Sequence, residues 1–180
     1  MNILINNQEV NFTKDDFPML ISGADKTGTS FFSICLLANL LKSGMKVLLF
    51  SAYPAAKEEF KKHIDDKEDK TIIIESGEES VFIETIEDIV DLSERVVLVK
   101  NIEAYHLQLF KTIKDAKLVI FSGDLDKCHY ADDLIKKDFT TKIFFSPATK
   151  YPQKKLTNLP KYHGRIFSDK YQGLVNLDMF

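Results

Sequence analysis

Short apolar runs alternate with amphipathic stretches along most of the chain, and this alternation constrains the fold more than any other feature. Six runs have the length and composition of buried strands, at residues 19–22, 47–51, 71–74, 96–99, 118–122 and 143–146. Apolar residues spaced for a helix predict helices at residues 31–42, 55–64, 81–92 and 104–113. Strands and helices that alternate in this way form a mostly parallel sheet with right-handed crossovers. We therefore predict an α/β domain.

The C-terminal part of the chain follows another pattern. The length of 180 residues suits one domain over residues 1–180, with a core at 1–146 and an extension at 147–180. Prolines and a glycine interrupt the extension, and two strand-like runs follow, at 165–168 and 174–177. They predict a terminal hairpin added at an edge of the sheet.

Composition narrows the class of protein. The formal net charge of -3 gives no general attraction to nucleic acid or to an anionic membrane. Two cysteines, Cys35 and Cys128, are too few for a disulfide framework. Because no positively charged segment with a long apolar run opens the chain, we expect a cytoplasmic protein without membrane contact.

Charge is uneven along the sequence. Residues 142–180 contain seven Lys and Arg against two Asp, which gives +5 and leaves -8 on the rest of the chain. Solvated lysines on a small subdomain are the interpretation we favour, and an anionic partner stays open. For nucleic acid we expect at most a weak, salt-sensitive and sequence-independent association. Its candidate residues are Lys150, Lys154, Lys155, Lys161 and Arg165.

A glycine-bracketed loop follows the first of the predicted buried strands. Residues 23–30 read GADKTGTS, which keeps Gly23 and Gly28 at the separation of the phosphate loop G-x-x-x-x-G-K-[ST]. In such a loop the backbone N–H groups face an anion, and the next helix presents its N-terminus to negative charge. Ser30 keeps the hydroxyl that would bind magnesium, whereas Thr29 stands where the lysine is expected.

The charges inside this loop oppose one another. Lys26 could turn toward a phosphate, whereas the carboxylate of Asp25 beside it opposes anion binding. The candidate phosphate-binding residues are Gly23, Lys26, Thr27, Gly28, Thr29 and Ser30.

The stretch from Leu20 to Phe60 resembles the nucleotide-binding core of RecA and KaiC-like ATPases. It reads LISGADKTGTSFFSICLLANLLKSGMKVLLFSAYPAAKEEF, with a strand, a phosphate loop, an apolar helix, a Lys-Val-Leu strand and an acidic helix in the order of that family. The resemblance implies a three-layer P-loop NTPase fold of the RecA type. It also implies a nucleotide site at the strand ends, often at a subunit boundary.

Compared position by position with that family, the resemblance implies that residues needed for ATP hydrolysis are replaced in this sequence. The phosphate-binding lysine corresponds to Thr29, and the glutamate that polarises water falls in the segment FSAYP at 50–54, with no acid before Glu58. Lys100 takes the place of the acidic residue that orders the metal. Each such part contributes about two to four kcal/mol of transition-state stabilisation. We therefore expect no catalytic residue, no metal site and no hydrolysis.

Binding is a separate matter, because backbone amides survive these substitutions. We expect no required cofactor and at most weak binding of ATP, ADP or phosphate. Lys100 either supplies a replacement cation or caps its strand and points to solvent, and we favour the second interpretation. Tyr53 could stack on a base or cover the vacated space, and Ser122 could touch a nucleotide, although a plain turn explains it as well.

Other candidate metal ligands have simpler explanations. His63 with Asp65 and Asp66 fits a solvated helix end. Cys128 and His129 are adjacent, so that their side chains diverge, and no second pair at zinc spacing exists.

Residues 26–31, KTGTSF, are also similar to the donor-binding loop of sulfotransferases. This second resemblance implies a catalytic role for Lys26 and makes Thr29 the expected residue. That family needs an arginine for the 3'-phosphate of the sulfate donor, and neither Arg95 nor Arg165 sits in such a setting.

Three functions stay open at this point. The first, which we favour, is a non-hydrolysing P-loop domain that works through a protein partner or as a homo-oligomer. The second is an active enzyme, either an unorthodox ATPase or a sulfotransferase that uses Lys26. The third is an accessory protein that binds nucleic acid through the basic C-terminal region.

Overall fold

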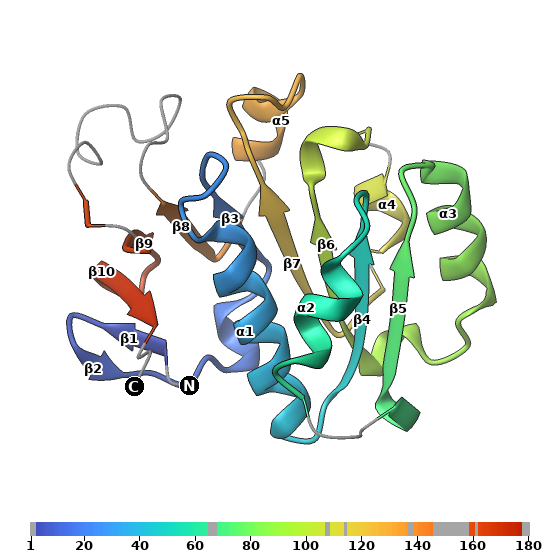
Figure 1. Ribbon diagram of the computed structural model, residues 1–180, viewed down its shortest axis with the longest axis horizontal. Coiled ribbons are helices and arrows are strands. Elements are labelled where there is room, and N and C mark those ends of the chain that lie inside the picture. Colours follow the sequence, from blue (N-terminus) through green and yellow to red (C-terminus); the bar gives the residue numbers. More distant parts are fainter. Residues whose placement is uncertain are drawn as a thin grey trace.

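The computed structural model describes residues 3–64, 68–106, 109–113, 115–136, 139–145, 159–160 and 162–177. Its centre is a ten-stranded sheet in the order β2-β1-β10-β9-β8-β3-β7-β6-β4-β5. Helices cover both faces of the parallel part of this sheet, which gives three layers (Figure 1).

All six predicted buried strands are present and run parallel to one another, in the order β8-β3-β7-β6-β4-β5. Their bounds are β3 (Met19–Ser22), β4 (Lys46–Ser51), β5 (Thr71–Glu75), β6 (Arg95–Lys100), β7 (Leu118–Gly123) and β8 (Thr141–Phe145). Strand β8 begins two residues before the predicted start, and Ser146 lies outside the described residues. Central strands are buried on both faces, which explains their continuous apolar composition.

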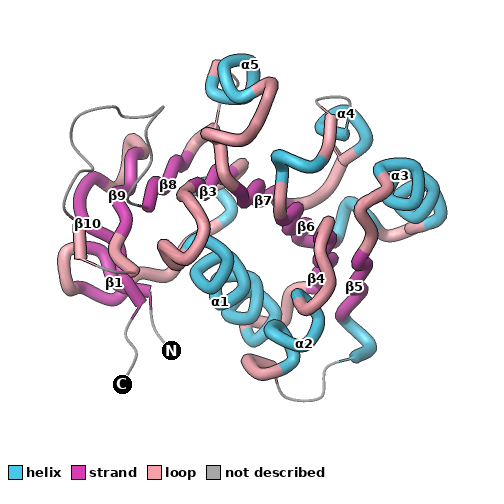
Figure 2. Tube along the Cα trace, turned by 45° about the horizontal axis from the view of Figure 1, so that its top comes forward, coloured by secondary structure: helices cyan, strands magenta, loops and turns pink. Residues whose placement is uncertain are grey.

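Helices α1 (Thr29–Lys42) and α2 (Ala56–Lys61) pack on one face of the sheet, as Figure 2 shows. The other face carries α3 (Glu79–Asp88), α4 (Leu109–Thr112) and α5 (Ala131–Ile135). The predicted stop of the first helix is confirmed, because Ser43 is its C-cap and Gly44 follows with φ +96°. No helix within the described ranges is long and apolar enough to cross a membrane.

Several helices are shorter than their apolar spacing predicts. The run 81–92 was expected to be one helix, but α3 ends at Asp88 and residues Leu92–Glu94 form a separate 3-10 turn. Within the described residues of the run 104–113, helix α4 covers four residues, and a 3-10 turn at Ile102–Ala104 lies before it in the chain. Within α3, Phe82 and Ile86 are buried, whereas Val90 beyond its end is exposed, so that spacing alone overestimates the helix length.

The predicted hairpin is confirmed, and it consists of β9 (Gly164–Phe167) and β10 (Gln172–Leu177). Its expected place at a sheet edge is wrong. Strand β9 pairs with β8, and β10 pairs with the N-terminal strand β1 (Ile3–Ile5), which in turn pairs with β2 (Gln8–Glu9). The N-terminal strands β1 and β2 therefore belong to the antiparallel part of the sheet, beside the C-terminal hairpin (Figure 1).

The sheet separates two hydrophobic clusters. The cluster around α1 contains Phe32 and Leu37 together with Val175 of β10, so that it extends over both the parallel and the antiparallel part of the sheet. The cluster on the opposite face is built around Phe50 and Phe82, whose ring centroids are 4.1 Å apart. Burial on both faces of one sheet is what holds the carboxyl ends of the strands in place.

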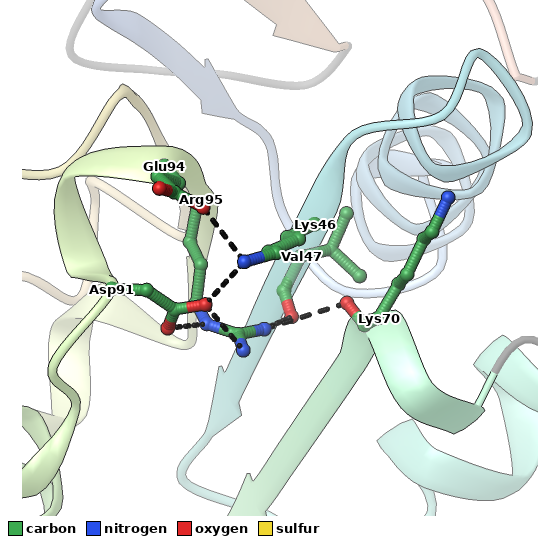
Figure 3. Close-up of polar contacts among 6 residues, drawn as sticks. All are labelled: Lys46, Val47, Lys70, Asp91, Glu94 and Arg95. Atoms are coloured by element: carbon green, nitrogen blue, oxygen red, sulfur yellow. Dashed lines mark hydrogen bonds and ion pairs between the residues drawn. The ribbon is translucent and has the colours of Figure 1, made fainter.

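A polar network joins the amino ends of β4, β5 and β6 (Figure 3). Arg95 is buried at the start of β6, and its guanidinium donates hydrogen bonds to the Asp91 carboxylate at 2.7 and 3.2 Å and to the carbonyls of Val47 and Lys70 at 3.4 Å. Lys46 donates to the same carboxylate at 2.7 Å. These two cations, with Lys46 first, lower the pKa of Asp91 to about 2.

This network predicts an acid-dependent contribution to stability. The folded-state pKa of Asp91 lies below its ordinary value near 3.9, so the carboxylate stabilises the fold fully above that value and loses its effect as pH falls toward 2. We expect Asp91→Asn to lower the free energy of unfolding at pH 6 and to differ less from the wild type at pH 3. Urea unfolding at both pH values measures this. A difference that is equal at both values would contradict it.

Candidate functional site

The parallel register brings the carboxyl ends of three strands to one place. Ser22 at the end of β3 is paired with Gly123 of β7, and Ser122 is paired with Lys100 at the end of β6. A cavity of about 360 Å³ opens there, between the loop after β3, the ends of β6 and β7, and helix α2. Its lining includes five of the six predicted loop residues, namely Gly23, Lys26, Gly28, Thr29 and Ser30.

Two glycines shape the loop. A Cβ atom at Gly23 would lie 2.4 Å from Thr29 Oγ1 and 2.7 Å from Phe145 Cβ, so that no other residue fits without displacement. Gly28 has φ +106° and is the N-cap of α1. Thr27, the sixth predicted residue, turns inward: its hydroxyl donates to the Ala24 carbonyl at 2.7 Å and lies 3.0 Å from Thr29 Oγ1. It holds the loop together and does not line the cavity.

The amide groups at the start of α1 are available to an anion. Within the described residues, the N–H groups of Gly28, Thr29 and Ser30 donate to no protein acceptor, whereas Gly23 N–H and Thr27 N–H are bonded to backbone carbonyls. Unpaired amides at the first turn of a 14-residue helix, together with its dipole, favour negative charge. The backbone part of a phosphate cradle is therefore in place.

Lys100 contributes to the cavity from the end of β6. The interpretation that it points to solvent is wrong: the residue is 5% exposed and lines the cavity. Its Nζ donates a hydrogen bond of 3.2 Å to Glu59 Oε2 of α2. A buried ammonium group needs a partner anion, because desolvation without one costs several kcal/mol, and Glu59 supplies it. Sequence reasoning missed Glu59, since its position on a charged helix shows no sign of this contact.

Three further carboxylates surround the loop. Asp25 is exposed and pairs with Lys127 at 2.6 Å, and Asp124 lies 3.5 Å from the same ammonium group. The ammonium group of Lys127 thus offsets the negative charge of Asp25, the carboxylate that was expected to oppose anion binding at the loop. Glu103 accepts a hydrogen bond from the Asp124 amide at 3.0 Å, and burial raises the pKa of its carboxyl. With Asp25, Glu59, Glu103 and Asp124 against Lys26 and Lys100, carboxylates outnumber cations in the lining.

A tyrosine covers the loop, but it is not the predicted one. Tyr53 is 55% exposed and does not line the cavity. Tyr162, which precedes β9, lies against Gly28 instead and forms part of the lining. Ser122 is buried in the lining, and Asp124, two residues further along the chain, begins a turn closed by a hydrogen bond from Lys127 N–H to the Asp124 carbonyl. Ser122 therefore lies in the cavity lining at the end of β7, and a turn follows it at Asp124.

The donor set does not fit a magnesium ion. The resemblance implies a metal next to Ser30. The end of β6 contributes the Lys100 ammonium group instead, and the Glu59 carboxylate is already paired with that group. Mg²⁺ prefers oxygen ligands and is repelled by a nearby cation. Among the described residues, no group of three or more His, Cys, Asp or Glu side chains could hold a metal ion.

The other candidate ligands are separate from the cavity. His63 packs edge-on against Phe31, with ring centroids 5.5 Å apart, while Asp65 and Asp66 lie outside the described residues. Cys128 is buried and its neighbour His129 is exposed, which agrees with the expected divergence.

Apart from Lys26, the charged residues of the alternative functions lie outside the cavity lining or outside the described residues. Arg95 lies at the amino end of β6, the end of the strand opposite Lys100, and Arg165 lies on β9. Neither belongs to the cavity lining. Of the basic C-terminal residues, Lys150, Lys154, Lys155 and Lys161 lie outside the described residues, so nucleic-acid binding stays a prediction.

The sequence matches no protein-family model and no curated protein. The structure, in contrast, resembles solved P-loop NTPases. The genome packaging NTPase B204 of Sulfolobus turreted icosahedral virus 2, in complex with AMPPCP, aligns with a TM-score of 0.64 at 13% identity, over 93% of this chain and 100% of that one. The same protein in complex with ATP-gammaS gives 0.61 at 12% identity, over 94% and 100%.

A further neighbour is the flagellar accessory protein FlaH of Methanocaldococcus jannaschii. It aligns with a TM-score of 0.60 at 16% identity, over 87% of this chain and 83% of that one. At these identities the likeness shows the fold alone. The fold is the RecA-like P-loop NTPase fold that the sequence predicts.

The crowding at Gly23 predicts a large cost for a small substitution. In Gly23→Ala the new methyl group would overlap Thr29 and Phe145, and overpacking of this kind costs about 1–3 kcal/mol. Gly77→Ala is the matched control, because a Cβ there would lie 3.6 Å from the Ala52 carbonyl, an ordinary contact. Urea unfolding of both variants measures the difference, and equal stabilities would contradict the geometry.

The ion pair between Lys100 and Glu59 predicts an asymmetry. The lysine side chain is 6% exposed and the glutamate side chain 32%, so only the glutamate can regain water when its partner is removed. We expect Glu59→Gln to lower the free energy of unfolding by about 1–3 kcal/mol, because it leaves a buried charge without an anion. We expect Lys100→Met to cost less or nothing. Chemical denaturation of the two variants tests the order, and the reverse order would refute it.

Proposed function

We propose that this chain is a non-hydrolysing P-loop domain that acts through protein interaction and binds nucleotide weakly. The observation that carries the proposal is the buried ion pair of Lys100 and Glu59. It occupies the strand end at which a P-loop ATPase of the RecA type needs a carboxylate for its metal. A positive charge at that place opposes the magnesium ion on which phosphoryl transfer depends.

Other parts of the loop region support the same function. Thr29 replaces the phosphate-binding lysine, and its hydroxyl is engaged with Thr27 inside the loop. At the end of β4, Tyr53 stands in the segment where the resemblance implies a water-polarising glutamate, and its side chain is turned to solvent. The backbone amides of Gly28 and Ser30 remain, which is consistent with weak binding without turnover.

The edge of the sheet supports an interaction role. Strand β5 pairs with β4 on one side only, and it is the last strand of the described sheet. Its residues Ile72, Ile73 and Ile74 are half-buried. An edge strand with an apolar face can pair with another chain, which suits a protein partner or a second copy.

This function predicts that the purified chain releases no phosphate from ATP. Three parts of the phosphoryl-transfer machinery are replaced, each worth about a hundredfold or more in rate, so we expect no turnover above background with ATP and magnesium. Phosphate release, followed over hours at high protein concentration, checks this.

The control separates a contaminant from the chain itself. Lys26→Ala removes the ammonium group of the loop that the alternative enzyme would use, while leaving Lys100 and Glu59 unchanged. Turnover that is present in the wild type and disappears in Lys26→Ala would overturn the proposal and favour an active enzyme. Turnover that is the same in both proteins belongs to a contaminant only if further purification removes it, and turnover that persists would also overturn the proposal.

A further inference from the structure

We propose that the cavity binds a polyphosphate group without a metal ion, and that a phosphate of the ligand replaces the Glu59 carboxylate on Lys100 Nζ. The ligand chemistry is a diphosphate, carried either by a nucleoside or by inorganic diphosphate. The inference rests on the proposed function, because a hydrolysing site would need its metal. It goes beyond that function in naming the ligand group, the cation that receives it and the side chain that leaves.

Lys100 supplies the fixed positive charge. Its side chain is 6% exposed, and within the described residues its hydrogen bond goes to Glu59 alone. A buried ammonium group must keep an anionic partner, whereas the identity of that partner is open. The lysine also lines the same cavity as Gly28 and Ser30.

Glu59 is the partner that can leave. Its side chain is 32% exposed, so the carboxylate can turn into water and keep its hydration when a ligand arrives. It belongs to α2, a helix of six residues, and the hydrogen bond to Lys100 is the contact that directs it into the cavity. Exchange of one anion for another therefore preserves the pairing of the buried lysine and returns the exposed acid to solvent.

The loop offers the second half of the site. The amides of Gly28, Thr29 and Ser30 have no acceptor among the described residues, and they belong to the first turn of a 14-residue helix. Two independent features favour an anion, namely the unpaired amides and the buried lysine. They act against the carboxylates of the lining, of which Asp25 and Asp124 are paired with Lys127. A diphosphate has enough oxygen atoms and charge to engage both the amides and the lysine, whereas a monoanion would satisfy only one.

Magnesium counteracts this mode of binding. An ion bound to the phosphate oxygens would bring two positive charges toward the Lys100 ammonium group, and it would neutralise the charge that the amides attract. The cavity therefore selects the metal-free form of the ligand. This is the reverse of the magnesium dependence that the resemblance implies.

The test is calorimetric titration of the full chain with ADP and, separately, with inorganic diphosphate. Each is titrated once in EDTA and once in excess magnesium. We expect binding in EDTA and a dissociation constant at least threefold weaker in magnesium. Lys100→Met should weaken binding in EDTA at least tenfold, Lys100→Arg should restore much of it, and Glu59→Gln should tighten it at least threefold.

Two variants on the exposed side of α2 serve as matched controls. Lys57→Met and Glu58→Gln make the same changes of charge at exposed positions outside the cavity lining, and both should bind as the wild type does. Circular dichroism confirms that each variant is folded. If Glu59→Gln does not fold, the magnesium comparison on the wild type and the Lys100 variants still decide the matter.

The outcomes separate this inference from the proposed function. Equal binding of ADP and diphosphate supports a site for the phosphate groups alone, and binding of ADP only supports a nucleoside diphosphate. Binding that requires magnesium, Lys100→Met that binds like Lys57→Met, or no binding of either compound in EDTA would overturn the inference while leaving a non-hydrolysing domain. ATP turnover would instead overturn the proposed function.

Discussion

The parallel register of the central strands determines what the cavity contains. Ser51, Lys100 and Ser122 are neighbours across the ends of β4, β6 and β7, and backbone hydrogen bonds fix these pairings whatever the side chains are. The residue at position 100 therefore lies at the same edge of the sheet as the loop that follows β3. A change of charge there alters the chemistry of the cavity and leaves the ladder intact, which is how a P-loop fold can persist with a lysine at this strand end.

The forces that hold the sheet together lie away from the cavity. The Asp91 and Arg95 network joins the strands at their amino ends (Figure 3), and two hydrophobic clusters cover the faces. At the carboxyl ends, the pair of Lys100 and Glu59 satisfies the buried charge from within the chain. Lys100, the most buried charged residue of the cavity lining, therefore has an anionic partner without a bound ligand.

The sequence predicts those elements whose burial or spacing leaves a recognisable pattern of residues. Strands buried on both faces, such as β4 and β6, were found from their apolar runs, and the loop from the spacing of Gly23 and Gly28. Strands β1 and β2 and helix α5 have two to five residues, too few for a period to appear. The direction of Lys100 could not be predicted, because it depends on Glu59, a residue 41 positions away whose helix gives no local sign of the contact.

An internal carboxylate acts as a tethered competitor for any anion that approaches Lys100. Tethered groups have effective concentrations in the millimolar range or above, so a ligand succeeds only if it adds contacts that Glu59 cannot make. The unpaired amides of Gly28 and Ser30 are such contacts. The helix that carries Glu59 also contacts the sheet edge, since the Lys57 amide donates to the Glu75 carboxylate of β5 at 2.8 Å. One short helix thus contacts both Lys100 in the cavity and the edge strand β5.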